Sequence, residues 1–273
     1  MLCPKPFALE VAGRKMITPC GKCLICRKLK ANEWTTRIKN HLEFNPDAFF
    51  LTLTYDNPRL DNFSLSVRCA QRFLKRLRKF YRERAVTYFG CGEYGAIRNR
   101  PHYHFIIFGV PMRLLSLRKI GDKLYSEIIA QEIWRSGFNN VGLVETGSIR
   151  YVTGYITKKR FNHQEVGYRE PEFHIMSKNL GLQALYENYD HYLKKFLGGE
   201  NIPRYYMKKI QEIEKIDPER KMLNSYIREA RHLVEVEKER NMREALRAIP
   251  RRNQQLEIDA ITLEKIYKQE NAL

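Results

Sequence analysis

Two histidines separated by one residue open an apolar stretch in the middle of the chain, Arg100-Pro-His-Tyr-His-Phe-Ile-Ile-Phe-Gly109. Side chains two residues apart in an extended strand point to the same face. His102 and His104 would therefore present two imidazoles from one stiff element, which is a plausible beginning of a metal site. The alternative is a strand edge with two surface histidines, and the spacing alone does not choose between them.

Glu93 is the candidate for a third ligand, because a catalytic cation that binds histidine also takes oxygen ligands. The residue follows an expected strand over 86–91. If that strand pairs with the next one, 103–108, in a hairpin, Glu93 lies beside the two histidines. The alternative is a loop carboxylate that pairs with Arg98 or Arg100.

Two tyrosines lie four residues apart in Ile149-Arg-Tyr-Val-Thr-Gly-Tyr-Ile-Thr-Lys-Lys-Arg160. On a helix, Tyr151 and Tyr155 share one face, and Lys158 and Lys159 follow one turn later. Tyrosine can act as a covalent nucleophile when a cation or metal activates it, and a nearby lysine can bind phosphate or protonate a leaving oxygen. Taken alone, the pattern is explained more simply as an ordinary apolar stripe.

Six cysteines include the cluster Cys20-x-x-Cys23-x-x-Cys26, with Cys3 nearby in sequence. In a chain expected in a reducing cytoplasm this spacing favours a metal over disulfides. Four thiolates predict a structural zinc site. An iron–sulfur cluster is the competing interpretation. Cys69 and Cys91 are expected to be packing residues.

The 273 residues carry a net charge of +18, with a pI of about 9.7, which predicts an anionic partner. Nucleic acid is the first candidate and an anionic membrane surface the second. No run of eighteen apolar residues and no signal-peptide core occur, so we expect no spanning helix and a cytoplasmic protein. The expected phosphate contacts are basic residues that could otherwise be solvated charge: Arg72, Lys75, Arg76, Lys79, Arg98, Arg100 and Arg160.

Hydrophobic periodicity predicts a β-α-β-β-α-β order in the middle of the chain. The expected strands are 49–55, 86–91, 103–108 and 139–145, and the expected helices are 27–44, 67–84, 116–135 and 148–160. This order predicts an α+β fold of ferredoxin-like (βαββαβ) type, an antiparallel sheet with helices on one face and its first and third strands in the centre. Residues 161–203 are expected to be irregular and the rest helical, with breaks at Pro218 and Pro250. We thus divide the chain into a cysteine-rich segment with a basic helix (1–44), a core (45–165) and an extension that ends in helices (166–273).

The motifs together resemble the HUH-type rolling-circle replication initiators, most closely those of gokushovirus-like microviruses, which are small single-stranded DNA phages. The resembling stretches lie within residues 1–160: Pro19-Cys-Gly-Lys-Cys-Leu-Ile-Cys26, Phe50-Leu-Thr-Leu-Thr-Tyr55, Gly92-Glu-Tyr-Gly95, Arg100-Pro-His-Tyr-His104 and Tyr151-Val-Thr-Gly-Tyr155-Ile-Thr-Lys-Lys159. One departure is Tyr103 between the histidines. Its hydroxyl would face the helix-covered side and needs a partner there.

The resemblance implies a nickase and ligase for single-stranded origin DNA that acts in a bacterial host. Mg²⁺ or Mn²⁺ on His102, His104 and Glu93 would polarise the scissile phosphate, and Tyr151 or Tyr155 would attack it. Lys158 or Lys159 would assist. The products would be a 5′-phosphotyrosine and a free 3′-hydroxyl, and the ends would later be rejoined. Expected partners are single-stranded and replicative-form origin DNA, with a host polymerase and helicase.

Two alternatives to this function remain. One is a transposase or relaxase of the same superfamily that uses a single tyrosine. The other is a non-catalytic DNA-binding module that contains zinc.

Overall fold

The computed structural model describes residues 3–11, 14–60, 63–95, 98–121, 124–157, 169–197 and 202–216. The chain forms two compact units, and helix α1 (Leu24–Phe44) contributes to both. The central unit consists of residues 34–188, and the terminal unit combines residues 1–33 with those from 189 onward. Each unit is described by itself.

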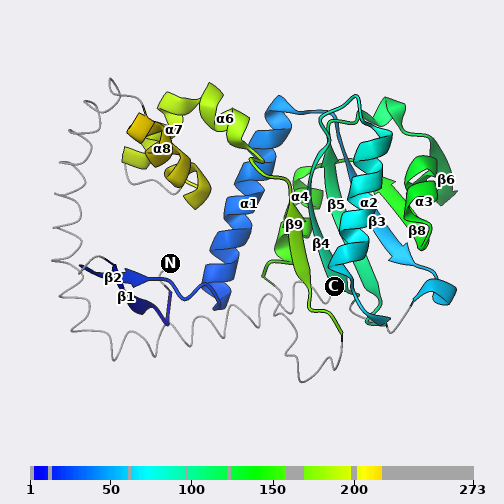
Figure 1. Ribbon diagram of the computed structural model, residues 1–273, viewed down its shortest axis with the longest axis horizontal. Coiled ribbons are helices and arrows are strands. Elements are labelled where there is room, and N and C mark those ends of the chain that lie inside the picture. Colours follow the sequence, from blue (N-terminus) through cyan, green and yellow to red (C-terminus); the bar gives the residue numbers. More distant parts are fainter. Residues whose placement is uncertain are drawn as a thin grey trace. The chain divides into compact units, whose positions relative to one another are not determined.

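The central unit is built on an antiparallel sheet of seven strands in the order β6-β7-β8-β3-β5-β4-β9 (Figure 1). Its strands are β3 (Ala48–Tyr55), β4 (Thr87–Tyr94), β5 (Pro101–Phe108), β6 (Leu117–Gly121), β7 (Leu124–Glu127), β8 (Gly137–Gly142) and β9 (Phe173–Met176). The expected α+β class with an antiparallel sheet is confirmed. The strands predicted to be central, now β3 and β5, lie next to each other inside the sheet.

One face of the sheet packs against helices α2 (Val67–Phe80) and α3 (Ile128–Trp134). Ser66 begins α2 as predicted, because its hydroxyl accepts a hydrogen bond from the amide of Cys69. Alternate residues of β3 and β5 fill this core, among them Leu51, Leu53 and Phe105, and all three are fully buried. The period-two alternation therefore assigns one row of side chains to the main core and the other row to the opposite face.

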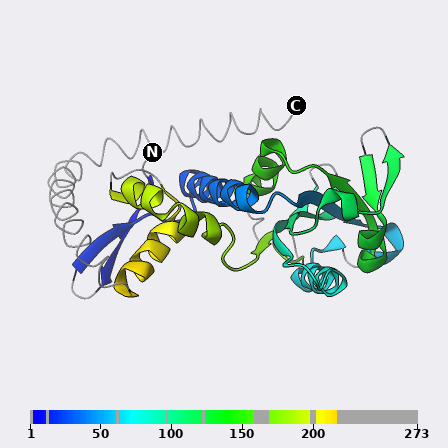
Figure 2. The ribbon, with the colours of Figure 1, turned by 90° about the horizontal axis from the view of Figure 1, so that it is seen from above.

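The opposite face is also covered, so the expectation of helices on one face only is wrong. The part of α1 in this unit contacts the sheet through Trp34 on Phe89 and His41 on Phe108, with ring centroids 5.0 and 4.7 Å apart. Helix α4 (Thr146–Gly154) lies on the same side, where Tyr151 contacts Phe50. Figure 2 shows α2 on one side of the sheet and α4 on the other. The reason lies in β5, whose continuous apolar run, typical of a strand buried on both faces, needs a cover on each side.

The helix expected over 116–135 is also wrong: β6 and β7 occupy most of that range and only α3 is helical. Apolar residues spaced by three and four suggested a helical face, yet Leu117 and Ile120 are exposed on β6. The helix begins only at Glu127, whose carboxylate accepts a hydrogen bond from the amide of Ala130. This N-cap fixes the helix start, and the periodicity of residues 116–127 gave no sign of it.

The remaining elements are short. A hairpin of β1 (Phe7–Val11) and β2 (Arg14–Thr18) precedes α1, and β9, α6 (Leu182–Glu187) and α7 (Tyr189–Leu197) occupy a stretch expected to be irregular. One-turn 3-10 helices lie at Asn57–Arg59 and Met112–Leu114. The expected helix after Pro203 is present as α8 (Arg204–Ile216), and Pro218 and Pro250 lie outside the described residues. None of the helices in the described ranges has the length and apolarity needed to cross a membrane.

The hydroxyl of Tyr103 has the partners that the sequence required. It lies 2.8 Å from the hydroxyl of Tyr55 and accepts a hydrogen bond of 2.9 Å from the amide of Ser66. These bonds join β5, β3 and the start of α2 inside the core. Tyr103→Phe would leave the Ser66 amide and the Tyr55 hydroxyl without this partner, at a cost of about 1–3 kcal/mol.

We expect urea denaturation of Tyr103→Phe to show that loss in the free energy of unfolding. Tryptophan fluorescence reports on the central unit, because Trp34 and Trp134 are the two tryptophans of the chain and both lie in it. Tyr125→Phe, at an exposed tyrosine on β7, is the matched control. Equal stability of the two variants would contradict the structural role of the Tyr103 hydroxyl.

His41 is a buried histidine held in its neutral form. Its Nδ1 accepts a hydrogen bond from the Gly181 amide, so Nε2 carries the proton and donates to the hydroxyl of Thr87, 3.0 Å away. Burial, and then the charge of Arg37, lowers the pKa of His41 from 6.5 to about 4. A lowered histidine pKa means that the unfolded chain takes up the proton first, so stability is lost as the pH falls from about 6.5 towards 4.

His41→Gln should reduce this acid sensitivity, because glutamine can still donate to Thr87 but does not titrate. We expect the free energy of unfolding to fall less between about pH 7 and pH 4 in this variant than in the parent protein, as measured by urea denaturation. His191→Gln removes an exposed histidine from the terminal unit and serves as the control. An unchanged pH dependence in His41→Gln would show that His41 is not the titrating group.

Candidate active site

The face of the sheet covered by α1 and α4 carries the polar side chains singled out in the sequence. Strands β4 and β5 form the expected hairpin, and its register places Glu93 opposite His102 and Cys91 opposite His104. On the other side of β5, Thr52 lies opposite His104 and Thr54 opposite His102. Directly paired residues project to the same face, so the register gathers all these side chains on one surface.

His104 is at the centre of this group and is 5% exposed. Its Nε2 lies 3.2 Å from a carboxylate oxygen of Glu93, and its Nδ1 lies 3.0 Å from the hydroxyl of Thr52. The Glu93 carboxylate accepts from Nε2, so Nδ1 accepts from Thr52. Glu93 thus contacts a site histidine, while Arg100, its alternative partner, donates to Asn57 and to the carbonyl of Tyr55.

Helix α4 brings both tyrosines onto His104. The ring of Tyr155 stacks on the imidazole at a centroid distance of 5.3 Å and an angle of 4°, and Tyr151 meets it edge-on at 5.2 Å. The helix begins with a capping box between Glu145 and Ser148, and the hydroxyls of Thr153 and Thr35, 2.8 Å apart, join it to α1. The prediction that the two tyrosines share one face is confirmed.

The helix itself is shorter than predicted, because α4 ends at Gly154. Tyr155 is the C-cap and keeps helical backbone angles, so the four-residue spacing still aligns the two rings. Gly154 is a poor helix former, which agrees with an end at this position. Lys158, Lys159 and Arg160 lie outside the described residues.

The two phenols differ in environment. Tyr151 is 50% exposed, whereas Tyr155 is 7% exposed. Burial, and then the neighbouring Tyr151 hydroxyl and Glu93 carboxylate, raises the pKa of Tyr155 well above its ordinary value. At neutral pH Tyr155 is therefore a protonated phenol, and it needs a group that removes its proton before it can act as a nucleophile.

The donor set of His102, His104 and Glu93 suits a divalent cation in chemistry. Nδ1 of His102 is buried without a hydrogen-bond partner, and burial lowers the pKa of this imidazole, which keeps it neutral as a ligand must be. The three side chains do not yet form a closed cluster. In the described part of the chain, the cysteine group alone brings three or more candidate ligand atoms within 4.8 Å of one another.

Comparison with known proteins places this site in a family. Residues 48–160, which contain both histidines, Glu93 and both tyrosines, match the model of a family described as replication-associated protein ORF2. Residues 48–160 belong to this replication-associated protein family. The resemblance predicted from the motifs is thereby confirmed.

Three curated relatives carry similar names. Replication-associated protein ORF2 of Spiroplasma virus 4 is 32% identical over 196 residues, which cover 65% of this chain and 59% of that protein. Replication-associated protein VP4 of Bdellovibrio phage phiMH2K is 31% identical over 170 residues, 59% of this chain and 54% of that protein. Replication-associated protein ORF4 of Chlamydia phage 1 is 26% identical over 226 residues, 74% of this chain and 55% of that protein. The chain thus spans between half and two thirds of the length of these relatives, and no solved structure matches it.

The basic residues considered for DNA contact are divided between several places in this replication-associated domain. The basic side chains of α2 are exposed, but α2 covers the sheet face opposite the tyrosines. Arg76 also donates to the carbonyl of Ile133 on α3. Arg98 is exposed in the loop between β4 and β5, while Arg100 is bound to the end of β3. The structure therefore brings the histidines, Glu93 and the tyrosines together and keeps the α2 residues apart from them.

Thr52 is the site residue that sequence reasoning did not assign. The Leu-Thr-Leu-Thr alternation indicated that threonines face away from the main core, and this is correct. Its contact with His104 follows only from the β3–β5 register, which the alternation cannot give. His174 on β9 is a second such residue, opposite Cys91, and its strand is too short to show a periodic pattern.

Thr52 should control how well His104 serves as a metal ligand. If Nε2 binds a cation, Nδ1 must carry the proton and donate to the Thr52 oxygen, an outer contact whose loss typically costs about 10–100-fold in metal affinity. We expect Thr52→Val to weaken Mn²⁺ binding about 10–100-fold, as measured by calorimetry. Thr52→Ser keeps the hydroxyl and should bind like the parent protein. Equal Mn²⁺ affinity of the valine and serine variants would exclude this role.

Proposed function

We propose that this chain initiates rolling-circle replication by nicking single-stranded origin DNA with a tyrosine nucleophile. The observation that carries the proposal is the contact of His104 with Glu93, Tyr151 and Tyr155 on one face of a replication-associated domain. The order β8-β3-β5-β4, with α2 and α3 on one face, supports a ferredoxin-like core of the HUH type.

His102, His104 and Glu93 would hold a divalent cation, Mg²⁺ or Mn²⁺. Two imidazoles and a carboxylate are donors that such a cation accepts, and His102 has a buried nitrogen free to bind it. When bound, the cation would polarise the scissile phosphate as a Lewis acid.

The tyrosines would do the covalent chemistry. A phenolate oxygen attacks the phosphorus, the new bond joins tyrosine to the 5′ side of the break, and the bond to the 3′ oxygen breaks. The phenol proton leaves to a base, and the released 3′ oxygen takes up a proton to become a hydroxyl. Lys158 or Lys159, which follow Tyr155 in the sequence, would stabilise the phosphate or supply that proton.

Two phenols on one imidazole suit an alternating reaction. After one tyrosine is linked to DNA, the second can cleave the regenerated origin, and the released 3′-hydroxyl attacks the first linkage to close a circle. Tyr151 is the accessible phenol, and Tyr155 lies deeper. A strand entering from solvent therefore meets Tyr151 before Tyr155.

Origin DNA, in its single-stranded and replicative forms, is the proposed substrate, with the bacterial cytoplasm as the place of action. The net charge of +18 supports strong phosphate binding, which weakens as salt is raised. The free 3′-hydroxyl would be extended by a host polymerase, with a host helicase separating the strands.

The test is formation of a covalent protein–DNA adduct. The protein is incubated with Mn²⁺ and a labelled single-stranded origin oligonucleotide, and adducts are separated by denaturing electrophoresis. We expect an adduct that persists in part in Tyr151→Phe and in Tyr155→Phe and falls to background in the double variant. Tyr125→Phe, at an exposed tyrosine on β7, is the matched control and should react like the parent protein.

Other outcomes separate the competing functions. Loss of all cleavage in one single variant would favour a transposase or relaxase with one working tyrosine. DNA binding without an adduct under any divalent metal would overturn the enzymatic proposal and favour a DNA-binding module.

A further inference from the structure

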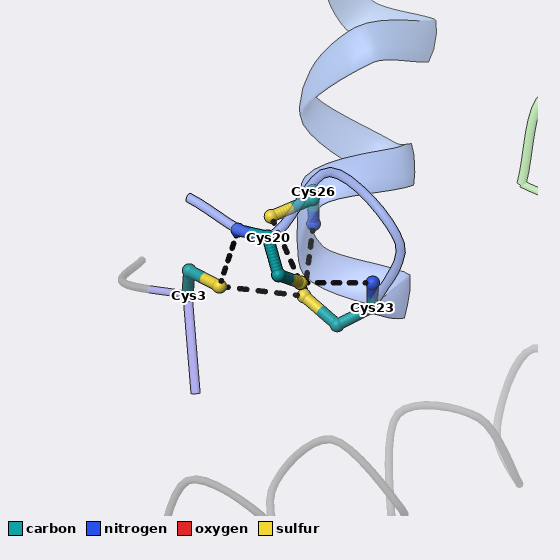
Figure 3. A group of neighbouring side chains, drawn as sticks. All are labelled: Cys3, Cys20, Cys23 and Cys26. Carbon is teal, nitrogen blue, oxygen red and sulfur yellow. Dashed lines mark hydrogen bonds between the residues drawn. The ribbon is translucent and has the colours of Figure 1, made fainter. Parts of the chain in front are cut away.

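Four cysteines meet in the terminal unit at a place that the proposed nicking reaction does not use (Figure 3). Cys3 precedes the β1–β2 hairpin, Cys20 follows it, and Cys23 and Cys26 lie at the start of α1. Their sulfur atoms all lie within 4.8 Å of one another, yet all four are free thiols. The sulfur atoms of Cys3 and Cys23 are 3.9 Å apart, and those of Cys20 and Cys26 are 4.0 Å apart.

These distances fit four ligands of one metal ion. Zinc binds thiolate sulfur at about 2.3 Å in a tetrahedron, whose sulfur–sulfur edges are then about 3.8 Å. The observed separations of 3.9 and 4.0 Å are close to this edge length and far longer than a disulfide bond. The cluster therefore needs little adjustment to enclose a single ion.

The same distances decide between the two metal interpretations that the sequence left open. An iron–sulfur cluster attaches its four thiolates to different iron atoms, which bridging sulfides hold apart. Its thiolate sulfurs are therefore spread more widely than four ligands of one ion. Sulfur atoms that all lie within 4.8 Å of one another match a mononuclear site.

Backbone amides around the cluster favour the thiolate form of the sulfurs. The amides of Lys22 and Cys23 donate to Cys20 Sγ at 3.4 and 3.3 Å, and the amide of Cys26 donates to Cys23 Sγ at 3.4 Å. Hydrogen bonds to a charged ligand stabilise it. Burial acts against ionisation of Cys20, but these amides outweigh it and lower the pKa of its thiol to about 6.

The hairpin between Cys3 and Cys20 has little apolar burial to hold it. Phe7, Leu9 and Ile17 are each more than two-fifths exposed. A short two-stranded hairpin without a buried face is only marginally stable in water. A metal bound at both of its ends would fix it by coordination, as in small domains that fold around a metal.

We propose that Cys3, Cys20, Cys23 and Cys26 bind one zinc ion, which closes the β1–β2 hairpin at its base and fastens it to the start of α1. Zinc has no redox chemistry, and four protein ligands leave no open position for a substrate, so the site is structural. The proposal is independent of the nicking reaction, because it concerns the terminal unit alone.

Metal analysis tests the stoichiometry and the identity of the metal. The full chain is purified under reducing conditions without chelator, and its metals are measured by mass spectrometry. We expect one zinc per chain, and Co²⁺ in its place should give the intense d–d absorption of a tetrahedral thiolate site. Iron with labile sulfide, or no metal with paired disulfides, would overturn the proposal.

Serine variants test the ligands. Cys3→Ser, Cys20→Ser, Cys23→Ser and Cys26→Ser should each lose zinc or bind it much more weakly, whereas Cys69→Ser, a partly buried cysteine of α2, should keep it. Undiminished zinc affinity in Cys3→Ser would remove that residue from the site.

Removal of the metal from the unmodified protein tests the structural role without relying on a variant that fails to fold. A chelator strong enough to extract zinc should speed hydrogen exchange of the amides in residues 7–18 and leave β3–β5 in the central unit protected. Unchanged exchange over residues 7–18 after zinc removal would contradict the structural role.

Discussion

The candidate site depends on the register of three neighbouring strands. In an antiparallel sheet, a slip of one residue would turn every side chain of a strand to the other face. Here the pairing of β3, β5 and β4 aligns Thr52, His104 and Cys91 in one row and Thr54, His102 and Glu93 in the next. The two rows supply every polar group that the site draws from these three strands.

Residues on the other face hold this register in place. The Tyr103 hydroxyl joins Tyr55 and the start of α2, which locks β5 against β3 one residue away from each histidine. Gly90 has a similar effect between β4 and β5, because a Cβ atom there would clash with the ring of Phe105. The main core thus fixes the strands, and the opposite face is left to carry histidines, a carboxylate and phenols.

Much of this could be predicted from particular residues. The histidine spacing, the hairpin that brings Glu93 to them and the four-residue spacing of the tyrosines each rest on a fixed period of strand or helix, and each is found. The errors arose where tertiary contacts decide. The apolar residues of 117–124 fit a helical period but lie in β6 and β7, and the cover of the second sheet face by α1 depends on pairs distant in sequence, such as Trp34 with Phe89. The link between Thr52 and His104 spans 52 residues, and no local pattern reports such a contact.

The position of α2 has a consequence for the path of bound DNA. Its exposed arginines and lysines face solvent on one side of the sheet, and Tyr151 is reached from the other. Seven strands about 4.8 Å apart give a sheet roughly 30 Å across, so a nucleic acid that contacts both sides must pass around one of its edges. A strand entering the tyrosine site would therefore bend or branch before it reaches the arginines of α2, and a forked junction fits that route better than a straight duplex.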